Sequence, residues 1–212
     1  MKNCLILNSD KKKWPKNYNL FFLGYWCLEN IKGSFADLSK FKVINNFEKT
    51  DSQVKKDVQA TKTIHINLVR DIAKELNRFH KRRFSEKFWE MTMGPWIKVF
   101  VGIVYERYTS LNFALKKYNI NHIVLADDKN FNFYTHNVGD LESKTPKNLD
   151  VWNFVLCTKI IKFLHKDLSF KKVKVLNFKN SHYNITSRSI KSYSKLLLSK
   201  FLNLFGTNKD FF

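Results

Sequence analysis

The clearest candidates for chemistry lie where a short apolar run gives way to acidic residues. Residues 122–126 form a short run rich in β-branched side chains, which predicts a strand. Asp127 and Asp128 follow this run directly. In an open α/β sheet, ligands bind in the crevice outside the carboxyl ends of the strands. Asp127 and Asp128 are therefore candidate site residues. The alternative is an ordinary turn after a strand, where Asp is common.

A histidine follows in the same stretch of chain. His136 belongs to an aromatic, polar segment, residues 129–147, that we predict to be a loop. The near-neutral pKa of an imidazole suits a general base. The alternative is a solvated loop histidine. No dinucleotide fingerprint, phosphate-binding loop, zinc-protease motif or nucleophile elbow occurs in the chain, so no motif assigns a reaction by itself.

Two further residue types could contact a ligand. Arg107 lies with Glu106 in an apolar helical segment and could hold an anionic group, or it forms a structural ion pair, because an unpaired buried charge is costly. Trp26 and Trp96 have flat faces on which sugar rings or bases stack. Indoles also pack in cores, and for Trp96 we predict a packing anchor beside Gly94-Pro95.

The elements that would position these residues follow from the apolar pattern. Residues 4–7 and 20–23 are short apolar runs between turn signals, which predicts two buried strands in one sheet. Thr50 and Gln53 form a capping box, so a long helix to about residue 79 should follow. We predict a short helix from Ser85 that breaks at Gly94-Pro95, and then a helix over residues 95–118 that is covered on several sides.

The apolar pattern predicts three further elements in the second half of the chain. We predict a helix over residues 150–164, a strand over residues 173–176 and an amphipathic helix over residues 186–205. This last helix either covers a core or lies on an anionic membrane surface. The return from helix to strand at residue 122 indicates α/β organisation. The simplest organisation is one α/β domain over residues 1–212, with a helix-rich segment at about residues 51–118.

The net charge of +20 suggests a polyanionic partner, such as nucleic acid. The composition argues for another origin. Nearly all the positive charge is Lys, with six Arg residues, whereas phosphate and base recognition favours the guanidinium fork. Asn, Phe and Ile are also abundant, so a codon bias explains the charge at least as well, and we do not expect nucleic-acid binding.

Cysteine usage and hydropathy indicate the cellular compartment of the protein. Cys4, Cys27 and Cys157 are odd in number and far apart, with no metal-ligand spacing, which predicts a reduced, cytoplasmic location. The N-terminus lacks the apolar run of a signal peptide. The longest apolar stretch, residues 96–105, contains Lys98 and falls short of the roughly 20 residues of a membrane span. We therefore predict no membrane-spanning segment.

Several blocks of sequence occur together in a distinctive order. They are Trp14-Pro15, Leu23-Gly24-Tyr25-Trp26-Cys27-Leu28, Phe88-Trp89-Glu90-Met91-Thr92-Met93-Gly94-Pro95-Trp96, Tyr105-Glu106-Arg107-Tyr108 and Asp150-Val151-Trp152-Asn153. The chain thereby resembles the amino-terminal half of a transferase family of surface-carbohydrate (O-antigen type) biosynthesis. The match spans roughly residues 3–165. The order of the blocks is far more specific than any one of them.

The resemblance implies a fold and a reaction. Members look like two-domain, GT-B-like glycosyltransferases with a Rossmann-like first domain and parallel sheet, in which the carboxy-terminal half mainly binds the nucleotide-sugar donor. The reaction is transfer of a sugar from that donor to a hydroxyl of a carbohydrate or lipid-linked acceptor. No cofactor is implied beyond the donor substrate, and no metal. With this resemblance, Asp127 or His136 becomes the catalytic base, and Trp26, Arg107 and Asp128 become substrate contacts.

Two departures from the family pattern qualify the resemblance. Tyr25 stands where the family pattern predicts an acidic residue, so no role is carried over to it. Family members are also much longer, and we expect the donor-binding domain to be absent from this chain. The chain is then a fragment or an acceptor-side domain encoded alone, inactive in isolation, located in the cytoplasm with peripheral contact to the inner membrane surface. The competing hypothesis is a non-catalytic basic domain that binds nucleic acid or a membrane surface.

Overall fold

The chain divides into two compact units in the computed structural model. The first unit comprises Met1–Phe47 and Tyr108–Ile185, and the second comprises Glu48–Arg107 and Thr186–Phe212. The structure describes residues 1–31, 41–44, 49–127, 149–164 and 170–174. The single-domain organisation predicted for residues 1–212 stays a prediction.

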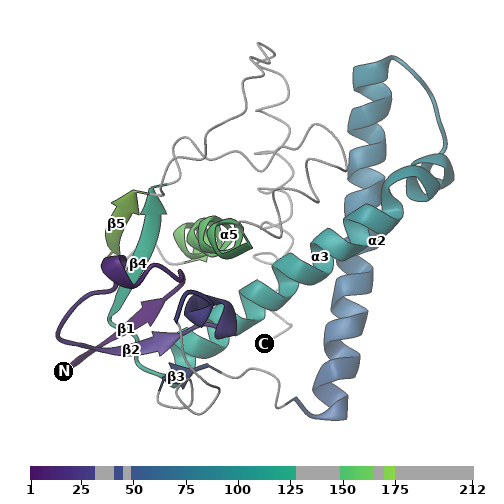
Figure 1. The fold of residues 1–212 in the computed structure, drawn as a ribbon. Helices are drawn as coiled ribbons and strands as arrows, with labels where there is room; N and C mark the ends of the chain where they lie inside the picture. Colours follow the sequence, from purple (N-terminus) through teal and green to yellow (C-terminus); the bar gives the residue numbers. More distant parts are fainter. Residues whose placement is uncertain (32–40, 45–48, 128–148, 165–169, 175–212) are drawn as a thin grey trace. The chain divides into compact units, whose positions relative to one another are not determined.

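The first unit is built on a parallel sheet. Its strands are β1 (Lys2–Ile6), β2 (Tyr18–Phe22), β3 (Lys42–Val43), β4 (His122–Asp127) and β5 (Phe170–Lys174). The strand order is β3-β2-β1-β4-β5, and every neighbouring pair is parallel (Figure 1). The predicted α/β class with a parallel sheet is confirmed. The strand predicted over residues 173–176 begins three residues earlier, at Phe170.

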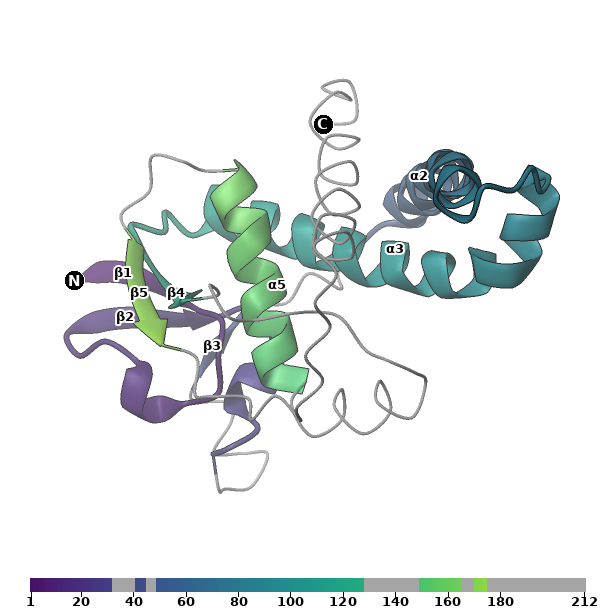
Figure 2. The same ribbon diagram turned by 90° about the horizontal axis from the view of Figure 1, so that it is seen from above.

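Strand β1 is the central strand of this sheet, with two strands on each side. Both of its faces are covered. The run from Cys4 to Leu7 has no exposed surface, as expected for a central parallel strand. Helix α5 (Leu149–Leu164) packs against β4 and lies over the sheet in Figure 2. Its Thr158 hydroxyl accepts a hydrogen bond from the backbone N–H of Ala126 at 3.0 Å. This bond fixes the helix against the strand that ends at Asp127.

Two short 3₁₀ helices connect the first strands. Helix η1 (Lys11–Lys13) lies between β1 and β2, and η2 (Tyr25–Leu28) lies directly after β2. Helix η2 packs against β2 and α5. Both connections therefore begin at the carboxyl ends of strands β1 and β2, where a doubly wound sheet binds its ligands.

The second unit contains two long helices that cross each other (Figure 1). Helix α2 (Asp51–His80) begins with the predicted capping box, in which Thr50 and Gln53 bond reciprocally. Helix α3 (Glu86–Lys117) follows after a short turn, and its residues 86–107 belong to this unit. The imidazole of His65 lies 3.0 Å from the carbonyl oxygen of Gly94, which joins the middle of α2 to the third turn of α3. The predicted helix-rich segment is confirmed.

The predicted helix break at Gly94-Pro95 is wrong. Helix α3 continues through it, with Pro95 inside the helix. Proline removes one backbone hydrogen bond, but a stripe of buried side chains continues across the predicted break, with Trp89 before it and Ile97 and Val101 after it. Tertiary packing thus outweighs the local break.

The predicted coverage of this helix is also wrong. Trp96 is 50% exposed instead of buried, and its ring stacks on Phe100 with centroids 5.4 Å apart. Val99 and Ile103 are exposed beside it. The buried side chains of α3 within the second unit form one stripe, and the opposite face of the helix is apolar but open to solvent. Trp96 is therefore not a core anchor.

Other sequence-based predictions have mixed outcomes. The loop predicted over residues 129–147 and the amphipathic helix predicted over residues 186–205 lie outside the described residues. Within the described part of the chain, no helix combines the length and apolarity needed to cross a membrane. Cys4, Cys27 and Cys157 are all free thiols and all buried.

Candidate functional site

The loop after β1 holds two polar residues that are almost fully buried. Asn8 is 3% exposed and Ser9 is 1% exposed. The indole N–H of Trp14 donates to the carbonyl oxygen of Asn8 at 3.2 Å, and the amide of Asn30 donates to the hydroxyl of Ser9 at 2.6 Å. Buried polar residues are costly unless they are bonded, so this loop is built around specific partners.

The Asn8 side chain is only partly satisfied. Its Oδ1 accepts from the backbone N–H of Asp10 at 3.1 Å, which identifies that atom as the oxygen of the amide. Its Nδ2 is buried and has no hydrogen-bond partner among the described residues. A buried donor without an acceptor costs about 1–3 kcal/mol, so a ligand oxygen placed here would gain a strong partner. Asn8 thus presents a donor at the carboxyl end of the central strand.

Helix η2 closes over the same strand end. The Cys27 thiol lies 3.4 Å from the carbonyl oxygen of Ile6, the last residue of β1. Trp26 lies against Gly24, where an added Cβ would fall 1.9 Å from the Cζ3 atom of the indole. Gly24 therefore has to be glycine for Trp26 to keep its place. Residues 23–27 thus pack η2 onto the end of β1.

The strand order reverses between β1 and β4, which makes this the topological switch point of the sheet. Cys4 pairs with His122 and Leu5 with Ile123, an offset of 118 residues. Extending that offset along the two strands places Ser9 level with Asp127. The crevice at a switch point, outside the carboxyl ends of the strands, is where ligands bind in sheets of this class. The loop of Asn8 and Ser9 and the end of β4 at Asp127 therefore lie at the same edge of the sheet.

Sequence reasoning found Asp127 here but missed Asn8 and Ser9. Residues 8–10 are the turn signal that follows the first predicted strand, and the side chain of Asn8 does form a turn with Asp10. The available signal was a pair of polar residues directly after a fully apolar strand at the centre of the sheet.

The predicted site residues are distributed over both units. Asp127 ends β4 and Trp26 lies in η2, both half-buried in the first unit. Arg107 belongs to the second unit. Asp128 and His136 lie outside the described residues. The roles assigned to all five stay predictions.

Arg107 has the surroundings of a structural residue. Its side chain is 17% exposed and forms an ion pair with the carboxylate of Glu106. This geometry favours the alternative stated from the sequence, a structural ion pair within an apolar helix. An anion-binding role for Arg107 stays a prediction.

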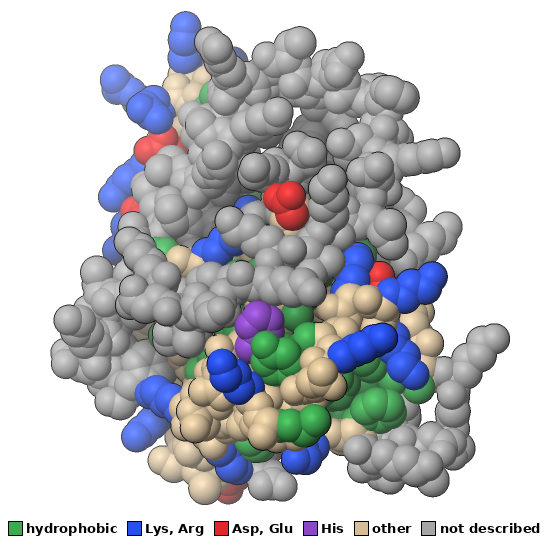
Figure 3. All heavy atoms as spheres, turned by 90° about the vertical axis from the view of Figure 1, so that its left-hand side faces the viewer, with side chains coloured by type: hydrophobic (Ala, Val, Ile, Leu, Met, Phe, Trp, Pro, Cys, Tyr) green, Lys and Arg blue, Asp and Glu red, His purple; other side chains and the backbone are tan. Residues whose placement is uncertain are grey.

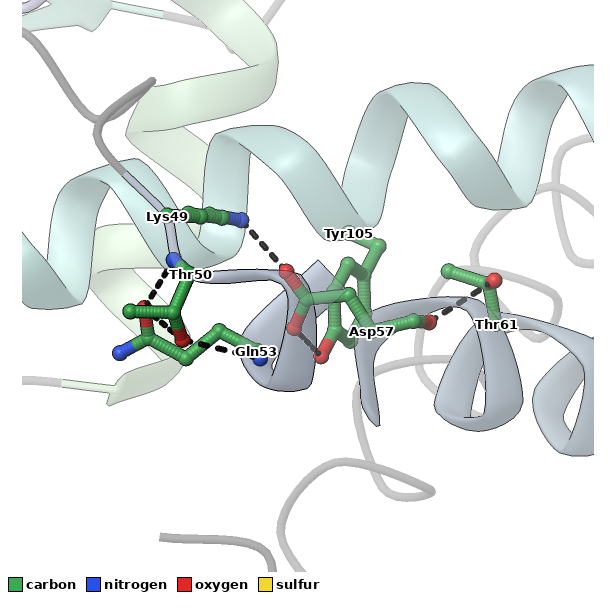
Figure 4. Close-up of polar contacts among 6 residues, drawn as sticks. All are labelled: Lys49, Thr50, Gln53, Asp57, Thr61 and Tyr105. Atoms are coloured by element: carbon green, nitrogen blue, oxygen red, sulfur yellow. Dashed lines mark hydrogen bonds and ion pairs between the residues drawn. The ribbon is translucent and has the colours of Figure 1, made fainter. Parts of the chain in front are cut away.

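A polar cluster in the second unit ties the start of α2 to α3. One carboxylate oxygen of Asp57 accepts from the phenol of Tyr105 at 2.8 Å, and the other pairs with the ammonium group of Lys49 at 2.5 Å (Figure 4). Both carboxylate oxygens thus have partners from this chain. The cluster is structural, and Asp57 is not free to act on a substrate.

Charge is spread over the face of the molecule shown in Figure 3. In Figure 3 the described Lys and Arg side chains lie singly among hydrophobic and uncharged groups instead of forming one basic patch. This distribution agrees with a compositional origin of the +20 net charge. Among the described residues, no group of three His, Cys, Asp or Glu side chains is placed to hold a metal ion.

One shallow hollow is lined by none of the site residues named above. Its volume is about 240 Å³, and it flanks β2 and β3, with a lining formed by Tyr18, Asn19, Leu20, Phe22, Phe41 and Lys42. It contains no carboxylate or imidazole. The chemistry-bearing residues therefore favour the switch point as the candidate site.

Comparison with known proteins gives the class of the chain. It belongs to the LIC12162 family of transferases, whose family model matches residues 3–212. The matched region is longer than the residues 3–165 expected from the sequence blocks. No curated protein and no solved structure matches the chain.

Proposed function

We propose that this transferase is a glycosyltransferase-type enzyme of surface-polysaccharide (O-antigen type) assembly, and that residues 1–212 form a Rossmann-like, acceptor-side part of a GT-B-like protein. The proposal is supported by family membership together with one structural observation. That observation is the switch point between β1 and β4, with Asn8 and Ser9 following β1 and Asp127 ending β4 at the same edge of the sheet. The order β3-β2-β1-β4-β5 is that of a doubly wound dinucleotide-binding sheet.

The proposed reaction uses the acidic residue at the end of β4. The oxygen of an acceptor hydroxyl attacks the anomeric carbon of a nucleotide-activated sugar. The bond from that carbon to the phosphate oxygen breaks, and the nucleoside phosphate leaves with the electron pair. The Asp127 carboxylate takes the hydroxyl proton as general base, with His136 as the other candidate. Asn8 Nδ2 donates to an oxygen of the bound sugar.

Three further residues have proposed binding roles. Trp26 stacks on a sugar ring of the acceptor, Asp128 accepts hydrogen bonds from sugar hydroxyls, and Arg107 contacts an anionic group. The acceptor is a carbohydrate or a lipid-linked carbohydrate. Nothing in the site calls for nucleic acid.

The test uses the protein as it is expressed in its native cell. The protein is supplied with a panel of nucleotide-activated sugars and a lipid-linked acceptor. Transfer is measured as the mass increase of the acceptor. Asp127→Asn removes the base and should lower the transfer rate by roughly 10²–10⁴-fold. Asp71→Asn removes one carboxylate from α2 and serves as the matched control. Full transfer by the Asp127→Asn protein would assign the base to His136 instead, and no sugar transfer from any donor contradicts the proposal.

A second variant tests the loop after β1 separately. Asn8→Asp keeps the oxygen that accepts from Asp10 but replaces the buried donor by a second acceptor. It should weaken acceptor binding, read as a raised KM, while the far-ultraviolet circular dichroism spectrum stays unchanged. An unchanged KM would remove Asn8 from the site.

A further inference from the structure

The turn between α2 and α3 carries a dense set of exposed aromatic and cationic side chains. Between Arg78 and Phe88 the sequence holds five Lys or Arg residues and one Glu. Every residue from 78 to 88 is exposed. Phe79, Phe84 and Phe88 are exposed by 50%, 42% and 37%. We refer to residues 78–88 as the hairpin tip.

The hairpin tip is held in a defined conformation by Asn77. The side-chain oxygen of Asn77 accepts from the backbone N–H of Phe84 at 3.0 Å and from the indole N–H of Trp89 at 3.1 Å. Its side-chain nitrogen donates to the carbonyl oxygen of Phe84 at 2.8 Å. The rings of Phe84 and Phe88 stack with centroids 4.3 Å apart. The exposed rings are therefore positioned by the fold.

The apolar surface of the hairpin tip continues along α3. At 100° per residue, Met91, Val99 and Ile103 lie on the same helical face as Phe88. All of them are exposed, and Met91 reaches 67%. Large apolar side chains grouped on an exposed face mark an interaction surface, because single exposed residues are common and groups are not.

We propose that the hairpin tip and this face of α3 dock on an anionic membrane surface. Surfaces that bind such membranes combine apolar side chains, which enter the boundary between headgroups and acyl chains, with Lys and Arg, which pair with lipid phosphates. The hairpin tip has both, and its cations match the negative charge of the lipid. Aliphatic Met91, Val99 and Ile103 cannot stack on bases, so the surface fits lipid better than nucleic acid.

This proposal does not depend on the transfer reaction, so it is tested without a sugar substrate. The full chain is sedimented with vesicles of phosphatidylcholine alone or with phosphatidylglycerol added. Arg82→Gln with Arg83→Gln removes two cations of the hairpin tip, and Lys55→Gln with Lys56→Gln removes two exposed cations from the start of α2 as the matched control. Phe84→Ser with Phe88→Ser removes the stacked rings. Circular dichroism checks the fold of each variant.

We expect binding only to the vesicles that contain phosphatidylglycerol, and weaker binding at high salt. The Arg82/Arg83 variant should bind roughly 30-fold more weakly, about 5-fold for each cation, and the Lys55/Lys56 variant should bind nearly as the parent chain does. Equal losses in the two charge variants overturn the proposal. So does tighter binding of a single-stranded oligonucleotide through the same residues, or a dimer that the Phe84/Phe88 variant abolishes without vesicles.

Discussion

The phenol of Tyr105 donates a hydrogen bond to the carboxylate of Asp57 across the two helices of the second unit, over a distance of 2.8 Å. Asp57 lies in the second turn of α2, and Tyr105 lies 48 residues further along the chain, on α3. Lys49, just before α2, pairs with the other oxygen of the same carboxylate. One half-buried carboxylate thereby fixes the start of α2 against α3.

Removing this hydroxyl should destabilise the second unit. Tyr105→Phe leaves the ring in place and should lower the free energy of unfolding by about 1 kcal/mol, because a hydrogen bond to a charged group is lost at a partly exposed site. Asp57→Ala should cost more, since Lys49 loses its partner too. Urea unfolding of both single variants and the double variant gives the coupling energy. Strict additivity of the two changes would show that the bond contributes nothing.

Gly24 offers a second test, on the packing of η2. Gly24→Ala places a Cβ within 2.2 Å of two atoms of the Trp26 ring, so the indole has to move. We expect a loss of roughly 1–3 kcal/mol in the free energy of unfolding, as for overpacked sites. The loss should be smaller when Trp26→Ala is also present, because the clash is then absent.

Gly102→Ala is the matched control for that change. A Cβ at Gly102 meets nothing within 4 Å, and the residue lies inside α3. Alanine is favoured over glycine in a helix by about 1 kcal/mol, so this variant should be more stable than the parent chain. Destabilisation by both alanines to the same extent would argue against a specific contact between Gly24 and Trp26.

The turn between the helices allows a third prediction. Asn77→Ala removes three hydrogen bonds that hold Phe84 and Trp89, and should cost roughly 2 kcal/mol. Asn77→Asp keeps the acceptor for both N–H groups and loses only the donor to Phe84, so it should cost less. Thermal unfolding ranks the two variants. The opposite ranking would show that repulsion between the new carboxylate and the carbonyl oxygen of Phe84 outweighs the two hydrogen bonds that the carboxylate accepts.

Local signals in the sequence predicted the elements whose causes are local. The capping box of Thr50 and Gln53 begins α2 because both partners lie within one turn. Strand β4 and the place of Asp127 at its end followed from a short β-branched run. These features depend on neighbours in the sequence and could be derived without the structure.

The features that sequence reasoning missed depend on distant contacts. Helix α3 passes through Pro95 because the stripe around Ile97 is buried in the fold and because His65 reaches the carbonyl group of Gly94 from α2. Asn8 and Ser9 are buried because Trp14 and Asn30 come to them from later in the chain. No pattern within the few residues around each position shows such partners.

Cys4 permits a prediction on the pH dependence of stability. Burial raises the pKa of its thiol from 9.0 to about 12. Below about pH 9 the thiol is protonated in both the folded and unfolded states and adds no pH dependence. Above that pH the unfolded chain loses the proton while the folded chain keeps it, so stability falls by about 1.4 kcal/mol per pH unit until the folded pKa is reached.

Replacing this thiol should reduce the loss of folding stability at alkaline pH. Cys4→Ala removes the titrating group, so its free energy of unfolding should fall less steeply above about pH 9 than that of the parent chain. Urea unfolding at a series of pH values measures the difference between the two proteins, which should shrink as the pH rises. The buried thiol should also resist alkylation at neutral pH until the chain unfolds, because the thiolate is the reactive form. A difference that is the same at every pH, with rapid labelling of Cys4 in the native chain, would show that this thiol is not held in its neutral form by burial.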